Sequence, residues 1–170
     1  MGSVVALLLV IFPALMVYAA FSDLLTMRIA NWLVLLVAAA YPVLALLAQT
    51  GWPELGMAAA AGAIVLAVAF AFFALGWIGG GDAKLIAAIA LWTGFGLLLP
   101  FVIYSALLGG ALTLLILAVR RYPLPAWLAR HKWIDRLHDT KTGVPYGIAL
   151  AIAAILVYPQ TALFERLLAL

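Results

Sequence analysis

Long uninterrupted runs of apolar residues constrain this chain more than any other feature. A helix that crosses the hydrocarbon core of a bilayer needs about 20 mostly apolar residues. Six runs approach or reach that length, and together they use most of the chain. They lie at roughly Val4–Ser22, Asn31–Ala48, Met57–Ile78, Ala83–Leu99, Phe101–Val119 and Val144–Leu163. The sequence therefore predicts an all-α polytopic membrane protein with six transmembrane helices in a single domain, residues 1–170. Pro100 is expected to mark a tight turn between the fourth and fifth helices.

The composition excludes a soluble globular protein. Hydrophobic residues make up 69% of the 170 residues and charged residues only 9%. Soluble domains are about 45–50% apolar and about 25% charged, so this chain has too few polar side chains to cover a water-exposed surface. Cysteine is absent, which also excludes disulfides, thiolate metal sites and cysteine nucleophiles.

The basic residues are distributed unevenly between the two sides of the predicted membrane. With alternating spans, eight of the nine Lys and Arg residues fall on one side, and Arg166 falls on the other. The eight are Arg28, Lys84, Arg120, Arg121, Arg130, Lys132, Arg136 and Lys141. Lys and Arg accumulate in cytoplasmic loops, so both termini are expected to be extracytoplasmic and the loop at about 120–143 cytoplasmic. The net charge of +3 is then a topology signal, and no nucleic-acid partner is expected.

The long loop carries apolar and basic residues at helical spacing. The apolar positions are Trp127, Leu128, Ile134 and Leu137, and the basic ones among them are Arg130, Lys132 and Arg136. This pattern is typical of a short amphipathic helix, near Ala126–His138, that lies on the inner leaflet. A solvated loop that only fixes the topology is the alternative.

Two of the six acidic residues lie where a predicted span meets the basic side of the membrane. The first span runs inward and ends at Asp23, and the fourth begins at Asp82 and runs outward. Both carboxylates therefore reach the same depth, where an ionisable group suggests function. Gly79, Gly80 and Gly81 directly precede Asp82. They form either a flexible turn or a loop that admits an extended peptide beside an acid.

Three further polar residues near these acids are candidates for substrate binding or for shaping the site. Lys84 and Arg28 either orient a substrate or extend to lipid headgroups. Asn31 either hydrogen-bonds a catalytic carboxylate or caps the second span. No ligand cluster with metal-binding spacing is evident, so neither a metal nor a cofactor is predicted.

The residues around both acids carry a family resemblance. Gly79-Gly80-Gly81-Asp82-Ala83-Lys84-Leu85 resembles the GxGD motif of type IV prepilin peptidases. Phe21-Ser22-Asp23, followed by Arg28-Ile29-Ala30-Asn31, is similar to the first-aspartate motif of that family, with Ala30 in place of its usual Pro. Pro145-Tyr146-Gly147 at the start of the sixth span also resembles the family. The chain looks like the short form found with Flp/tight-adherence pilus systems, because the cysteine-containing insert of larger members is missing.

The resemblance implies an aspartic endopeptidase in the bacterial inner membrane, with Asp23 and Asp82 as the catalytic pair. Its expected partners are the lipid bilayer and a prepilin, whose short basic leader is cleaved from a membrane-inserted helix at the cytoplasmic face. N-methylation of the product, which the larger members also perform, is not predicted. Because Asp23 lies near a helix C-terminus and Asp82 at a helix N-terminus, the helix dipoles favour Asp82 as the base and Asp23 as the acid.

Other classes of function also place acids in membrane spans. A proton-coupled transporter carries them near the midplane, often with internal repeats, whereas both acids here lie at one face and no repeat is evident. Another GxGD membrane protease, of the presenilin and signal-peptide-peptidase group, is a further alternative, but Pro145 is followed by Tyr146 rather than by that group's Ala-Leu. A non-catalytic scaffold leaves the two acids and the glycines unexplained.

The charge distribution makes the topology testable with reporter fusions. A reporter fused at Leu170 is expected to be active only outside the cytoplasm, and one inserted within 130–141 only inside it, because eight basic residues hold their side in the cytoplasm. A cytoplasmic signal at Leu170 would rule out six spans with extracytoplasmic ends.

Overall fold

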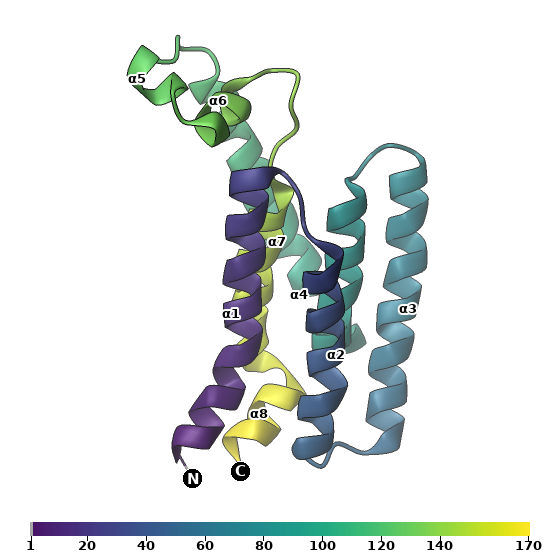
Figure 1. The fold of residues 1–170 in the computed structure, drawn as a ribbon. Helices are drawn as coiled ribbons and strands as arrows, with labels where there is room; N and C mark the ends of the chain where they lie inside the picture. The colour runs from purple at the N-terminus through teal and green to yellow at the C-terminus, as the bar shows by residue number, and fades with distance from the viewer. Residues whose placement is uncertain (1) are drawn as a thin grey trace.

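A computed structural model describes residues 2–170 and shows an all-helical chain, with no strand in that range (Figure 1). The helices are α1 Gly2–Thr26, α2 Asn31–Leu47, α3 Trp52–Ala74, α4 Gly80–Val119, α5 Ala126–Ala129, α6 Lys132–His138, α7 Tyr146–Val157, the 3-10 turn η1 Tyr158–Gln160, and α8 Ala162–Leu168. The predicted all-α class is confirmed.

Three of these helices are long and apolar enough to cross a membrane: Val4–Thr26, Trp52–Ala74 and Gly80–Val119. The pair Tyr146–Gln160 and Ala162–Leu168, bent by 57°, makes a fourth when it is counted as one span. Helix α2, with 17 residues, is apolar but shorter. Many large apolar side chains are exposed on the outer surface of these helices, as expected where a protein faces lipid rather than water.

Helix α4 is two helices joined at Gly94. Forty residues of straight helix would be about 60 Å long, twice the thickness of a bilayer core. The regular helix is interrupted at Gly94, whose φ of 56° and ψ of −170° lie in a region that only glycine adopts readily. Figure 1 shows the first half running beside α3 and the second half returning to the end of the bundle that carries α5 and α6.

The turn expected at Pro100 was therefore placed wrongly, because the chain reverses at Gly94 and Pro100 lies inside the second half of α4. The missing N–H of Pro100 would have paired with the carbonyl of Gly96, which belongs to the first turn after the break. A proline so close to the start of a helix disturbs few hydrogen bonds.

The core joins α1, α2, α4 and α7 around Trp92. The Phe12 ring lies 4.4 Å from the Trp92 ring and 4.9 Å from the Tyr158 ring, between centroids. The Trp92 indole donates a hydrogen bond of 3.1 Å to the carbonyl of Val37, which satisfies its one polar atom in the core. On one side of this core, α2 and α3 each pack on the first half of α4 but scarcely contact each other.

Residues 120–143 form two short helices in place of the single amphipathic helix predicted at Ala126–His138. The break falls at Arg130 and His131, where the backbone of His131 is extended. The Arg120 guanidinium donates to the carbonyls of Leu137 at 2.8 Å and Gly143 at 3.0 Å, which ties the end of α4 to the loop. Its place on the inner leaflet stays a prediction.

The helix break provides a test of the fold. Gly94→Ala is expected to lower the free energy of unfolding by about 1–3 kcal/mol, because an alanine Cβ opposes the backbone conformation at this position. Gly96→Ala is the matched control, since φ is not positive there and a Cβ would meet no atom within 4 Å. Thermal unfolding in detergent micelles measures both, and equal midpoints for the two variants would contradict the assignment.

Candidate active site

Asp23 lies near the end of α1 and is almost completely buried, with 5% of its surface exposed. Its Oδ2 accepts a hydrogen bond of 2.7 Å from the backbone N–H of Gly147, in the first turn of α7. The first N–H groups of a helix have no partner within the helix, so this bond satisfies one of them and holds the carboxylate of α1 against the start of α7.

Gly147 permits this contact because it has no side chain. A Cβ there would lie 2.8 Å from Asp23 Oδ2 and 3.0 Å from Ile29 Cδ1. Both distances are too short for unstrained contact. Glycine at this position is thus required for close approach rather than for backbone freedom.

The turn after α1 places Ile29 between the two acidic segments. Met27 has a left-handed φ of 54°. The Ser22 hydroxyl donates to the carbonyl of Arg28 at 3.0 Å, which ties the turn to α1, and the Thr26 hydroxyl donates to the carbonyl of Ser22 at 2.7 Å. Ile29 is buried there, and a Cβ on either Gly81 or Gly147 would press against it.

Asp82 is the third residue of α4 and is partly buried. Its carboxylate folds back over Gly79, so that a Cβ at Gly79 would lie 2.9 Å from Asp82 Oδ2. Ile29 links its surroundings to those of Asp23, because Ile29 packs both against Gly81, the residue before Asp82, and against Gly147, which binds Asp23. The structure therefore brings together the two acids that the sequence singled out, although 58 positions of the chain separate residues 23 and 82.

The three glycines before Asp82 are packed rather than flexible. Gly79 is the N-cap of α4 with an ordinary φ of −70°, and neither Gly80 nor Gly81 has a positive φ. A Cβ on Gly80 would lie 3.1 Å from the Phe73 ring, and one on Gly81 would lie 3.3 Å from Ile29. The structure thus disfavours the flexible-turn interpretation: glycine is needed here because there is no room for side chains.

The other predicted site residues are Lys84, Asn31 and Arg28, and none of them is seen to bond a carboxylate of Asp23 or Asp82. Lys84 Nζ donates a hydrogen bond of 3.0 Å to Asn31 Oδ1, so these two side chains pair with each other. Asn31 is the first residue of α2 and its N-cap is Ala30, so the expected capping role is not observed. The side chain of Arg28 is exposed. Its contact with the site is made by its backbone carbonyl, which accepts the hydrogen bond from the Ser22 hydroxyl.

The structure also changes the basis of the acid–base assignment. Asp23 lies near the C-terminus of its own helix, but its carboxylate faces the N-terminus of α7. Asp82 lies at the N-terminus of α4. Both carboxylates thus meet the positive end of a helix dipole, and the dipoles alone no longer distinguish the base from the acid.

A model of the type IV leader peptidase family matches residues 10–114, a range that contains Asp23, Asp82 and the glycines between Trp77 and Asp82. The chain belongs to the type IV leader peptidase family. No curated protein and no solved structure matches it. Membership of the family makes this chain a leader-peptidase-like protease, which favours the peptidase over the transporter and scaffold alternatives. Within the described part of the chain, no group of three His, Asp or Glu side chains gathers as a metal site would require.

Several residues that shape the site have no role that the sequence predicts. Gly147 and Ile29 belong to motifs that resemble the family, but their contacts with Asp23 and Gly81 depend on the fold. The only sequence signal for Ser22 and Thr26 is that these two hydroxyl residues lie four positions apart, one helical turn, at the end of the first apolar run. Arg136 donates at 3.1 Å to the carbonyl of Leu25, which brings the basic loop to the helix end that carries Asp23.

The contact between Gly147 and Asp23 is testable. Gly147→Ala is expected to slow proteolysis by about 10²-fold, because its Cβ displaces the Asp23 carboxylate and a misplaced catalytic group costs about that much. Gly110→Ala adds the same methyl group where no atom lies within 4 Å. Cleavage of a leader-peptide substrate in membranes measures both. A Gly147→Ala protein as active as its control would show that the contact does not matter.

Proposed function

We propose that this protein is an aspartic endopeptidase that removes the short basic leader from prepilins at the cytoplasmic face of the bacterial inner membrane. The observation that carries the proposal is the convergence of the end of α1, with Asp23, and the start of α4, with Asp82, on the two sides of Ile29, within the range matched by the family. Family membership supports proteolysis, and the paired carboxylates support the aspartic type.

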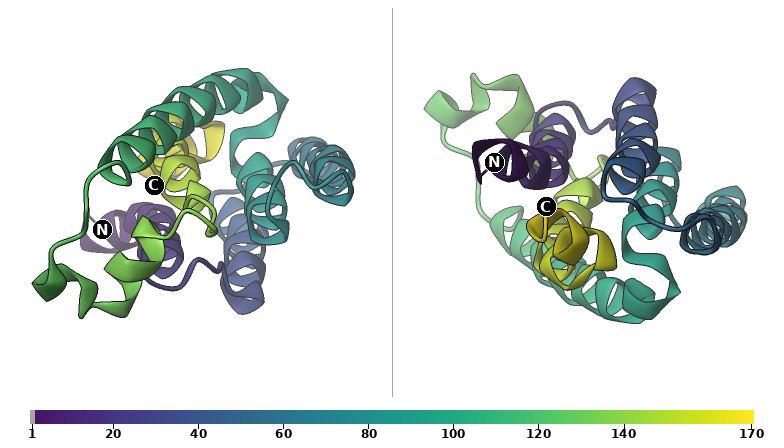
Figure 2. Two further views of the ribbon diagram at one scale, coloured as in Figure 1. Left: turned by 90° about the horizontal axis from the view of Figure 1, so that it is seen from above. Right: turned by 90° about the horizontal axis from the view of Figure 1, so that it is seen from below.

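We further propose six membrane spans, with both termini outside the cytoplasm. The break at Gly94 divides α4 into two helices, the bent pair α7–α8 counts as one span, and α2 with 17 residues reaches the lower limit of about 17 for a spanning helix. Both termini lie at the opposite end of the bundle from α5 and α6 (Figures 1 and 2). This arrangement agrees with the uneven distribution of basic residues and favours a cytoplasmic site.

The two carboxylates provide the groups that peptide hydrolysis needs. When one is ionised and the other protonated, the ionised carboxylate accepts a proton from water as the water oxygen attacks the scissile carbonyl carbon. The protonated carboxyl donates a hydrogen bond to the carbonyl oxygen and then delivers its proton to the leaving amine as the C–N bond breaks. At the end of the cycle the dyad again carries one proton, now on the other carboxylate. Because the charge of each carboxylate affects the other, the pair titrates as a unit rather than as two independent groups.

The substrate has to present its backbone to this dyad, and the missing side chain of Gly79, next to the Asp82 carboxylate, favours that. A peptide within a helix has its N–H and C=O groups occupied, so the scissile segment must be extended when it is cleaved. Gly79 is exposed and has no side chain beside the Asp82 carboxylate, which leaves room there for an approaching chain. A prepilin fits these requirements if its apolar helix lies in the bilayer while its leader stays in the cytoplasm.

Asp23→Asn and Asp82→Asn test the proposed chemistry. Each is expected to slow prepilin cleavage by at least about 10²–10⁴-fold, since an amide can neither accept nor deliver the required proton. The double variant is expected to be scarcely slower than either single one, because residues that act as a unit are not additive. A gel-shift assay in membranes follows the reaction, and a chelator is expected to leave the wild-type rate unchanged.

Asp135→Asn is the control, because it removes an exposed carboxylate from α6 on the same side of the protein. Each variant is also checked for membrane insertion and thermal stability, so that loss of cleavage is not confused with loss of the fold. Near-normal cleavage by either active-site variant, or inhibition of the wild type by the chelator, would refute the proposed mechanism.

A further inference from the structure

A groove of about 460 Å³ lies between α2 and α3, and neither Asp23 nor Asp82 lines it. It exists because these two helices pack on the first half of α4 but scarcely on each other. Small residues leave the space open, and α4 forms its floor. The lining includes Ala38 of α2, Gly62 and Ala63 of α3, and Ala87 and Ala88 of α4.

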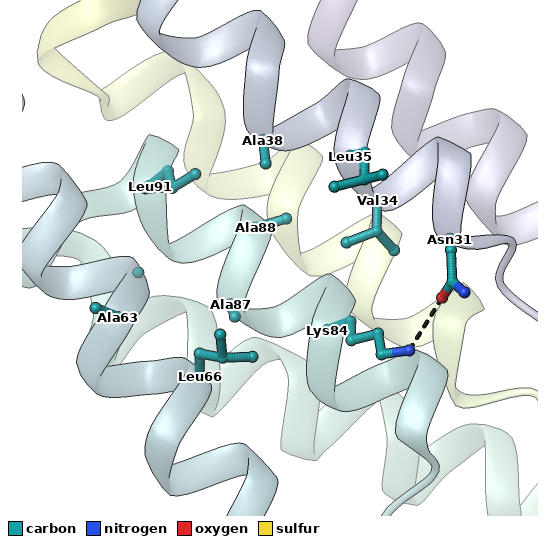
Figure 3. A pocket seen from close by; sticks show the side chains of 11 residues that line it. Asn31, Val34, Leu35, Ala38, Ala63, Leu66, Lys84, Ala87, Ala88 and Leu91 are labelled. Atoms are coloured by element: carbon teal, nitrogen blue, oxygen red, sulfur yellow. Dashed lines mark hydrogen bonds between the residues drawn. The ribbon is translucent and has the colours of Figure 1, made fainter.

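The groove is polar at one end and apolar along the rest of its length. Figure 3 shows the paired side chains of Lys84 and Asn31 at one end, and those of Leu91 and Ala38 at the other. Each of these two stretches, from Asn31 to Ala38 and from Lys84 to Leu91, covers two helical turns, or about 10 Å. The groove therefore has a cationic mouth and an apolar interior.

The charge of Lys84 is not neutralised by a carboxylate. Its ammonium group donates to the neutral amide of Asn31, and the ion pair found among residues 2–170 joins Arg166 to Glu54 elsewhere. Lys84 is exposed, so two of its donors are free for an anion. The side-chain N–H groups of Asn31 can join them, because the Asn31 oxygen is already the acceptor of the Lys84 bond.

The outer walls of the groove face the surroundings of the protein. Leu35 is 68% exposed and Leu66 is 45% exposed, and both line it. Water molecules in a space with apolar walls find few hydrogen-bond partners, so an apolar ligand is the better occupant of this groove. A methylene group occupies about the same volume as a water molecule in the liquid, about 30 Å³, so the groove holds on the order of 15 methylenes. The volume is ample for an acyl chain, and the length of about 10 Å takes the part of the chain nearest the headgroup.

We infer that the groove binds an anionic phospholipid, with its phosphate on Lys84 and Asn31 and one acyl chain along α2, α3 and α4. The cationic mouth lies on the side of the protein where basic residues accumulate, and the cytoplasmic leaflet is the one enriched in anionic lipids. Because Lys84 is two residues from Asp82, the lipid headgroup lies beside the candidate active site. The inference requires a membrane location but not proteolysis, so it can be tested on a protein that cleaves nothing.

Lipid retention by the purified full-length protein tests the site. The protein is equilibrated in micelles with equal amounts of phosphatidylglycerol and phosphatidylcholine, and the lipids that remain bound are identified by native mass spectrometry. The wild type is expected to retain about fivefold more phosphatidylglycerol than phosphatidylcholine, the factor that one lysine near an anionic surface contributes. Lys84→Gln is expected to abolish that preference, and Lys84→Arg to keep it.

Three further variants separate the groove from general attraction to charge. Ala63→Leu fills the groove and is expected to reduce the retention of both lipids, whereas Ala71→Leu adds the same volume at an exposed position of α3 that does not line it. Lys141→Gln removes an exposed loop charge and is expected to leave the preference intact.

Three results would overturn the inference. The first is an unchanged lipid preference in Lys84→Gln, and the second is an equal loss of preference in Lys141→Gln. The third is a groove that holds the substrate instead, shown by a photo-crosslinker at position 63 that captures a prepilin peptide while lipid retention does not depend on Lys84.

Discussion

The hydrogen bond from the Gly147 N–H to the Asp23 carboxylate joins two segments 124 residues apart in the chain. In an apolar surrounding every exposed backbone N–H is costly, and a carboxylate without partners is costlier still. The start of α7 and the end of α1 therefore satisfy each other. The position of Asp23, the turn that follows it and the placement of Ile29 against Gly81 all depend on how closely these two helices approach.

Glycines allow the helix ends to approach each other so closely. Gly147 admits Asp23, and Gly79, Gly80 and Gly81 admit Asp82, Phe73 and Ile29 in turn. None of these four glycines has a positive φ, so their common property is small size rather than conformational freedom. The result is a region where three helix ends converge, with Asp23 at the end of α1 and Asp82 at the start of α4.

Small residues also shape two other parts of the bundle, the break in α4 and the groove between α2 and α3. At Gly94 the backbone itself is the requirement, because the chain must turn between the two halves of α4. On the other side of the first half, α2 and α3 pack on α4 rather than on each other, and the small side chains between them leave the groove beside Lys84. The helix that carries Asp82 thus has the candidate active site at its start, an apolar groove along its side and a reversal at its far end.

The sequence by itself determined the membrane-embedded helical class, the two carboxylates and the glycines beside Asp82. These follow from local properties: apolar length, the cost of an acid at the membrane surface, and short motifs that resemble one family. Only the tertiary structure decided that Gly94 rather than Pro100 breaks α4, that the basic loop folds as two helices, and that Asn31 pairs with Lys84. It also revealed Gly147 as the partner of Asp23. Contacts of this kind depend on how closely helices from distant parts of the chain approach, and local sequence does not contain that distance.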